Sequence, residues 1–204
     1  MTDAAFWDKA APKYAKDPIS DMDGYTATLN RMKEILQPHH RVLEIGCGTG
    51  STALELAPNV DRYIGTDISA GMIEIAQSKQ TLETPSHLRF AVHEADDIPA
   101  APHDVILALN LLHLLPNLEL VLDRIYESLP SGGVFIAKSG LLKDGKWFLP
   151  LMIPVMRAFG KAPYVRNMNE DELRTLLKDA GFEITEALVQ PGIAPRIFTI
   201  ARKP

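Results

Sequence analysis

The chain of 204 residues contains a single cysteine, Cys47, so it has no disulfide framework of its own. Its N-terminus is polar and lacks the apolar segment of a secretory signal, which together with the low cysteine content predicts a reducing, cytoplasmic location. No cluster of cysteine and histidine has the spacing of metal ligands, so no metal is expected. The net charge of -5, without a basic stripe, argues against nucleic acid as the main partner.

Long apolar runs are also absent. The segment Trp147 to Met156 is ten residues long and includes two prolines, whereas a membrane-spanning helix needs about 20 apolar residues. Lysines and arginines flank it, at Lys143, Lys146, Arg157 and Lys161. The sequence therefore allows weak contact with a membrane surface but does not predict stable insertion.

What remains is the composition of a soluble globular protein, with 46% hydrophobic and 23% charged residues. Continuous apolar runs such as Val105 to Leu109 predict central strands covered by helices on both faces, hence a doubly wound α/β sheet. The length fits one domain over 1–204, and its last two strands should form an antiparallel hairpin across 190–192. Strands are expected at 41–46, 62–67, 87–92, 104–109, 132–138, 182–189 and 196–202, and helices near 22–36, 51–58, 70–80, 117–129 and 169–180.

The most informative stretch runs from Arg41 to Gly50, where an apolar strand ends in Glu44 and three glycines follow at alternate positions. Glycines at a strand-to-helix turn permit positive φ and let a ligand approach the backbone. A second strand ends in Asp67, an acid suited to binding a ribose. A dinucleotide fingerprint needs glycine or alanine at position 51, where this chain has Ser51. The pattern therefore indicates a nucleotide-like ligand other than a dinucleotide.

These residues resemble the class I S-adenosylmethionine-dependent methyltransferases, whose first motif, E/D-x-G-x-G-x-G, is matched from Glu44 to Gly50. The resemblance implies a Rossmann-like sheet of seven strands, mostly parallel, with an antiparallel C-terminal strand inserted beside the fifth. It also implies S-adenosyl-L-methionine as cofactor and S-adenosyl-L-homocysteine as product. The activity it implies is methyl transfer to a small acceptor by in-line displacement.

The resemblance extends to later motifs and implies the cofactor-binding residues. Asp67 would hold the ribose hydroxyls, with Ile68 beside the adenine, and either Glu94 or Asp96 would contact the adenine edge. The implied set is Tyr14, Glu44, Gly46, Cys47, Gly48, Gly50, Asp67, Ile68, Met72, Glu94, Ala95, Asp96, Asn110 and Leu111.

Two segments outside the core are expected to define the substrate side. Residues 1–37 resemble an N-terminal helical lid, in which Tyr14 would reach the methionine carboxylate. The alternative is that its aromatic residues only pack on the sheet edge. The inserted segment 141–165 is expected either to wall the site for a lipophilic or aromatic acceptor, or simply to pack on the neighbouring helix.

Candidate catalytic residues are few. His113 follows the fourth strand, where its ordinary pKa would suit a general base. The alternative is that it only shapes the pocket. Tyr25 is a second candidate. Two functions compete with small-molecule methyl transfer: a nicotinamide-dependent oxidoreductase and a non-catalytic S-adenosylmethionine-binding protein. The chain is expected to be a monomer or a homodimer.

Overall fold

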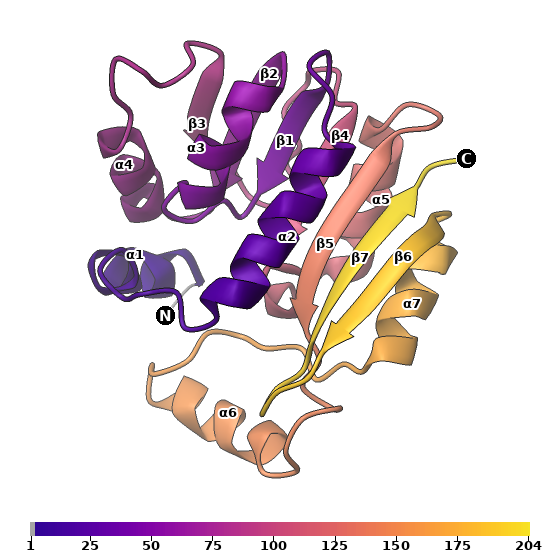
Figure 1. Ribbon diagram of the computed structural model, residues 1–204. Helices are drawn as coiled ribbons and strands as arrows, with labels where there is room; N and C mark the ends of the chain where they lie inside the picture. The colour runs from indigo at the N-terminus through magenta and orange to yellow at the C-terminus, as the bar shows by residue number, and fades with distance from the viewer. Residues whose placement is uncertain (1–2) are drawn as a thin grey trace.

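The computed structural model describes residues 3–204 and contains one seven-stranded sheet in the order β3-β2-β1-β4-β5-β7-β6 (Figure 1). The strands are β1 (Arg41–Ile45), β2 (Arg62–Asp67), β3 (Leu88–Val92), β4 (Val105–Leu109), β5 (Val134–Gly140), β6 (Glu183–Gln190) and β7 (Arg196–Arg202). The helices are α1 (Asp3–Tyr14), α2 (Met22–Ile35), α3 (Ser51–Leu56), α4 (Ala70–Ser78), α5 (Leu118–Ser128), α6 (Leu149–Ala158) and α7 (Glu170–Asp179), with short 3-10 turns η1 (Ala57–Asn59) and η2 (Leu112–Leu114).

The sheet is parallel except at β7, which pairs antiparallel with both β5 and β6. In the β5–β7 ladder Lys138 lies opposite Phe198, and Gly140 lies opposite Arg196. The predicted hairpin across 190–192 and the predicted place of the last strand beside the fifth are therefore both confirmed.

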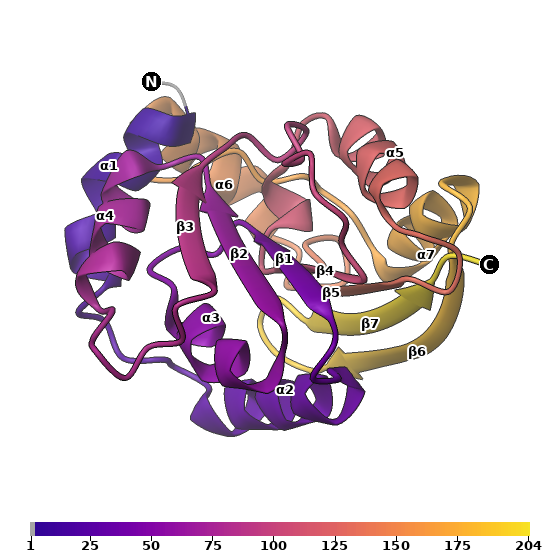
Figure 2. The same cartoon turned by 90° about the horizontal axis from the view of Figure 1, so that it is seen from above.

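Helices cover both faces of the sheet because the central strands are apolar on both faces. Along β4, Val105 and Leu107 join one buried cluster with α2, α3 and α4, whereas Ile106 and Ala108 join another with α5 and α7. Figure 2 shows α2 and α3 on one side of the sheet and α5 and α7 on the other. The predicted doubly wound class is confirmed.

Two helices lie at the edge where the parallel strands end: α1 beside α4, and α6 near the ends of β5 and β6 (Figure 1). The helix α6 was not predicted, because Pro150 and Pro154 interrupt the apolar stretch. Pro150 falls in the first turn, where backbone N–H groups have no partner within the helix. Only Pro154 removes a hydrogen bond from its interior, and the helix forms despite that loss.

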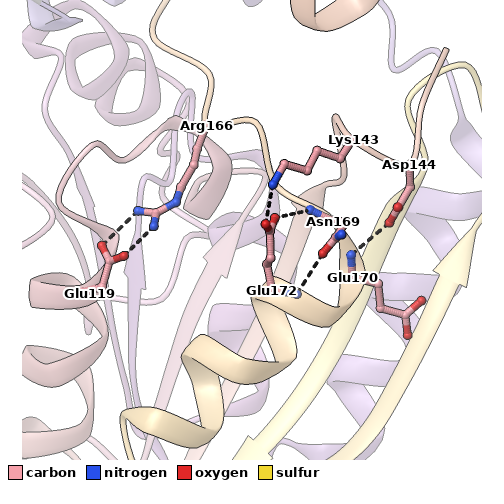
Figure 3. Close-up of polar contacts among 7 residues, drawn as sticks. All are labelled: Glu119, Lys143, Asp144, Arg166, Asn169, Glu170 and Glu172. Carbon is pink, nitrogen blue, oxygen red and sulfur yellow. Dashed lines mark hydrogen bonds and ion pairs between the residues drawn. The ribbon is translucent and has the colours of Figure 1, made fainter. Parts of the chain in front are cut away.

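The chain that follows residues 141–165 is fixed by the cap of α7 (Figure 3). Asn169 Oδ1 accepts the backbone N–H of Glu172 at 2.9 Å, and Glu172 Oε2 accepts the backbone N–H of Asn169 at 3.0 Å. Lys143, at the start of the segment, forms an ion pair with the same Glu172. Glu172 therefore joins the parts of the chain that precede and follow α6.

Further polar contacts hold the same two parts of the chain. Asp144 Oδ2 accepts the backbone N–H of Glu170 at 2.9 Å, and the Arg166 guanidinium pairs with both carboxylate oxygens of Glu119 on α5 (Figure 3). The Arg166 backbone N–H donates to the His113 carbonyl at 2.7 Å. These two parts of the chain are thus tied to α5, α7 and η2, and α6 lies between them.

Candidate functional site

A cavity of about 320 Å³ opens at the carboxyl ends of β1, β2 and β4. The order of the strands brings these three ends together, with α1 as the outer wall. Most of the predicted cofactor-binding residues line it: Tyr14, Gly46, Gly48, Asp67, Ile68, Met72, Glu94, Ala95, Asp96, Asn110 and Leu111.

The glycine loop takes backbone conformations that other residues rarely adopt, with φ of +70° at Gly46 and +53° at Gly48. A Cβ on Gly46 would lie 2.9 Å from a methyl group of Leu111, so this position must be glycine for packing. A Cβ on Gly48 would meet only the Tyr14 ring, at 3.9 Å. Gly48 thus leaves its backbone open to the cavity, as a closely approaching ligand requires.

Asp67 is fixed at the end of β2 by two backbone donors. Its Oδ2 accepts the N–H of Gly48 at 2.9 Å, and its Oδ1 accepts the N–H of Ser69 at 2.9 Å. Burial raises the pKa of Asp67, although both hydrogen bonds act in the opposite direction. Because a carboxylate oxygen can accept more than one hydrogen bond, each oxygen can still bind a hydroxyl group.

Helix α1 is attached to this same corner. Asp8 Oδ1 accepts the Ser69 hydroxyl at 2.6 Å and the Gly71 N–H at 3.1 Å, while Ser69 Oγ caps α4 by accepting the Met72 N–H at 3.1 Å. These hydrogen bonds lower the pKa of Asp8. The helix that carries Tyr14 is therefore joined through Ser69 to the acid at the end of β2.

The wall formed by α1 is aromatic and acidic. Trp7 and Tyr14 line the cavity and their rings meet edge-to-face at 6.4 Å, and Asp3 lies on the same wall. Partial burial, together with the charge of Asp67, raises the pKa of Tyr14. The sequence did not single out Asp3 for the site, since an acid in the first turn of a helix has no distinguishing pattern.

Three predicted residues lie behind the loop instead of on the cavity wall. Glu44 is 2% exposed, its Oε2 accepts the Tyr63 hydroxyl at 2.8 Å, and burial raises its pKa to about 8. Cys47 is also buried, and burial raises the pKa of its thiol. Gly50, with φ of +74°, begins α3. These three residues therefore support the conformation of the loop from behind, on the side away from the cavity.

Both candidates for the adenine edge line the cavity. Asp96 Oδ2 accepts the side-chain amide of Asn117 at 2.8 Å, whereas Glu94 has no such partner among the hydrogen bonds of residues 3–204. Asn117, which begins α5, was missed by the sequence analysis because only the fold brings it to Asp96. Which acid contacts adenine stays a prediction, and Asp96 is the more firmly oriented of the two.

Asn110 follows β4 with φ of +57°, the only positive φ at a non-glycine residue among residues 3–204. Its N–H donates to the Lys138 carbonyl at 2.7 Å, so this conformation is fixed by the neighbouring strand. Asparagine tolerates the left-handed region of positive φ better than most residues do. Such local strain is common at binding sites, which agrees with the place of Asn110 on the cavity wall.

The two candidate catalytic residues are not brought into the cavity. His113 Nδ1 accepts the Gly140 N–H at 3.1 Å, and burial lowers its pKa to about 4. The ring is therefore neutral with its proton on Nε2, and it has no free lone pair to act as a base. Tyr25 packs against the buried cluster under α2. The catalytic roles of both residues stay predictions, and this geometry does not favour them.

In the described part of the chain, no helix combines the length and apolar character needed to cross a bilayer. Nor do residues 3–204 gather three or more histidine, cysteine, aspartate or glutamate side chains that could hold a metal ion.

The sequence matches the profile of one protein family and is similar to many known proteins. The profile of the family described as "Methyltransferase domain" matches residues 19–187. The highly reducing polyketide synthase aurA of Calcarisporium arbuscula is 32% identical over 184 residues, covering 83% of this chain and 7% of that protein. The chain thus spans less than a tenth of the length of the curated relatives it matches.

Solved structures share the fold. A methyltransferase of Thermotoga maritima, described as a possible histamine N-methyltransferase, superposes with a TM-score of 0.72 at 21% identity over 99% of this chain and 100% of its own. Magnesium protoporphyrin IX methyltransferase from Synechocystis, solved with S-adenosylhomocysteine bound, gives 0.68 at 20% identity over 88% of this chain and 84% of its own.

Proposed function

Because the chain belongs to the methyltransferase domain family, we propose that it transfers a methyl group from S-adenosylmethionine to a small lipophilic or aromatic acceptor. The observation that carries this proposal is the pairing of Asp67 with the open backbone of Gly48 in one cavity. Family, fold class and cofactor are those that the sequence predicted. The nicotinamide alternative loses its support, since the glycine spacing and the family match both point away from it.

The residues of the cavity fit the cofactor. Asp67, held by two backbone N–H groups, would accept both ribose hydroxyls. Gly48 would let the methionine portion lie against the backbone, and Tyr14, which faces Gly48 from α1, would reach its carboxylate. Ile68 and Met72 would provide apolar contacts to the adenine, and Asp96, oriented by Asn117, would accept from its amino group.

Bound S-adenosylmethionine supplies an electrophilic methyl group on a sulfonium. The protein's part is to align the acceptor with that methyl group and to exclude water. Asn110 and Leu111, at the end of β4, would form the floor below the acceptor, and α1 would cover the cavity as a lid. No step requires a protein base when the acceptor reaches the site already deprotonated or as a free amine.

The choice of a lipophilic acceptor rests on α6. Leu151 and Val155 on α6, and Phe159 directly after it, are 66%, 58% and 75% exposed. The helix itself lies at the edge where the parallel strands end (Figure 1). Relatives such as aurA are polyketide synthases, which supports polyketide-like acceptors as one group to test. Residues 141–165 would then form the substrate-side wall.

Calorimetric titration with S-adenosylmethionine, S-adenosylhomocysteine and NAD tests the proposal first. Micromolar binding of the first two is expected to be lost in Asp67→Ala and kept in Asp61→Ala, an exposed acid shortly before β2. Saturable NAD binding without the other two would overturn the proposal. Cofactor binding without turnover across lipophilic phenols, amines and carbon acids would instead indicate a non-catalytic binding protein.

A further inference from the structure

Three basic side chains gather where β5 ends and β7 begins, beside the cofactor cavity. They are Lys138 on β5, Arg196 at the start of β7, and His113 on η2. In a chain of net charge -5, such a group without acidic partners is notable. None of the three forms an ion pair within residues 3–204.

The strand register places Arg196 next to His113. Arg196 lies directly opposite Gly140 in the antiparallel ladder, and opposed residues project from the same face of a sheet. A Cβ on Gly140 would lie 3.4 Å from His113 Cδ2 and 3.5 Å from its Nε2. The imidazole therefore covers Gly140 on the face from which Arg196 projects, with its N–H at Nε2.

Lys138 lies two residues earlier on β5 and projects from that same face. It is only 6% exposed, and its Nζ donates to Thr28 Oγ1 at 3.1 Å and to the Gly24 carbonyl at 3.4 Å, both on α2. The charge of Asp21 raises the pKa of Lys138, but the Asp21 side chain caps α2 and forms no ion pair with Lys138. Burying an ammonium group without a counter-ion costs free energy. A bound anion beside Lys138 would offset that cost.

The three basic residues are within electrostatic range of one another and of the cavity wall. The charge of Arg196 lowers the pKa of Lys138 and of His113, in both cases after the larger effect of burial. It also lowers the pKa of Tyr14, against the effects of burial and of Asp67. Tyr14 lines the cavity. The backbone gives the same placement: Leu111 and Leu114, on either side of His113, both line the cavity, so the three basic residues lie beside it at the ends of β5 and β7.

We propose that Arg196, Lys138 and the Nε2–H of His113 bind an oxyanion, a carboxylate or a phosphate, carried by the methyl acceptor. We name these three residues the basic subsite. The inference rests on the proposed function and makes it more specific: the acceptor is an amphiphile, with its anion at the basic subsite and its apolar portion toward α6. Guanidinium and ammonium groups are well suited to this binding, because hydrogen bonds between charged groups are the strong ones.

The test measures binding of probe molecules to the complex with S-adenosylhomocysteine. Decanoate and phenyl phosphate are titrated by calorimetry against their uncharged counterparts, decanamide and phenol. The anionic probes are expected to bind at least about tenfold more tightly, as the loss of one hydrogen bond to a charged group predicts. The tighter of the two anions identifies the group, because a carboxylate and a phosphate differ in shape and charge.

Variants assign the effect to the basic subsite. Arg196→Gln and Lys138→Met should each remove about tenfold of anion affinity, and Arg196→Lys should restore part of it. Arg202→Gln, an exposed arginine at the other end of β7, should change nothing. S-adenosylhomocysteine affinity should stay unchanged in all four.

Equal affinity for charged and uncharged probes would overturn the inference, as would no binding of either anion at millimolar concentration. An equal loss in Arg202→Gln would do the same, because it would indicate a general charge effect. In each of these cases S-adenosylhomocysteine still binds and the proposed function stands. If S-adenosylhomocysteine itself fails to bind, the proposed function fails first.

Discussion

The carboxylate of Asp67 accepts the backbone N–H of Gly48 at 2.9 Å, which joins the acid at the end of β2 to the glycine loop that follows β1. Because parallel strands end at the same edge, residues 19 positions apart in sequence meet here. The acid is therefore oriented before any ligand arrives, so the protein need not order it upon binding.

Replacing Gly48 with alanine tests the role of the open loop. At φ of +53° a Cβ costs about 1–2 kcal/mol of stability, and it would point toward the cavity and Tyr14. Gly132→Ala is the matched control, because it has φ of +79° and open space around it, far from the cavity. Both variants should lose similar stability in urea, but only Gly48→Ala should lose affinity for S-adenosylmethionine. Equal affinities in the two variants would contradict a close approach at Gly48.

The attachment of α1 gives a second prediction. Asp8→Ala removes the acceptor of the Ser69 hydroxyl and the Gly71 N–H, so α1 should open more often. Hydrogen exchange should become faster across residues 5–14 while the sheet is unaffected, and cofactor affinity should fall several-fold because Tyr14 is less often in place. Lys9→Ala, an exposed position on the same helix, is the control. Unchanged exchange in Asp8→Ala would show that apolar packing alone holds α1.

Glu44 makes stability depend on pH. Its folded pKa of about 8 lies well above the value of 4.5 for an exposed glutamate. The folded state therefore binds a proton that the unfolded state releases between these values, and stability falls as pH rises through this window. The loss should be on the order of a few kcal/mol. Urea unfolding at a series of pH values should show this slope in the wild type and a flatter one in Glu44→Gln.

Glu44→Gln should also bind S-adenosylmethionine with nearly wild-type affinity, because glutamine retains an oxygen for the Tyr63 hydroxyl. A large loss of affinity in a stably folded Glu44→Gln would place the carboxylate itself in contact with the cofactor. It would also contradict the position of Glu44 behind the loop.

The parts of the site that sequence could predict are those encoded within one short segment. The strand, the turn and the helix start from Arg41 to Ser51 are contiguous, and each glycine serves a local backbone need. Asp67 was predictable for a similar reason, as the last residue of an apolar strand. The hairpin of β6 and β7 followed from the lack of any helix pattern between them.

The parts that sequence could not predict depend on neighbours brought together by the fold. The surroundings of His113 were not predictable, because nothing in η2 reveals that the Gly140 N–H would donate to its Nδ1. The pairing of Asn117 with Asp96 joins the start of α5 to the loop after β3. In α6, local propensity was misleading, because Pro150 and Pro154 are residues that usually interrupt a helix. Pro150, however, lies in the first turn, where no hydrogen bond is lost.

The tautomer of His113 provides the last prediction. With Nδ1 accepting from Gly140 and a pKa of about 4 in the folded state, the ring should stay neutral with its proton on Nε2 from pH 5 to 9. Nitrogen-detected NMR of histidine side chains should show one slowly exchanging ring with this tautomer, absent in His113→Gln.

Since unfolding restores an ordinary pKa near 6.5, the unfolded state takes up the proton first, and His113 should lower stability as pH falls from 6.5 towards 4. In His113→Gln that acid-side loss should shrink, while the Gln side-chain N–H replaces the Nε2 donor and should preserve part of the anion affinity of the basic subsite. A ring that titrates near 6.5 in the folded protein would contradict this assignment and would favour a role of His113 as a base.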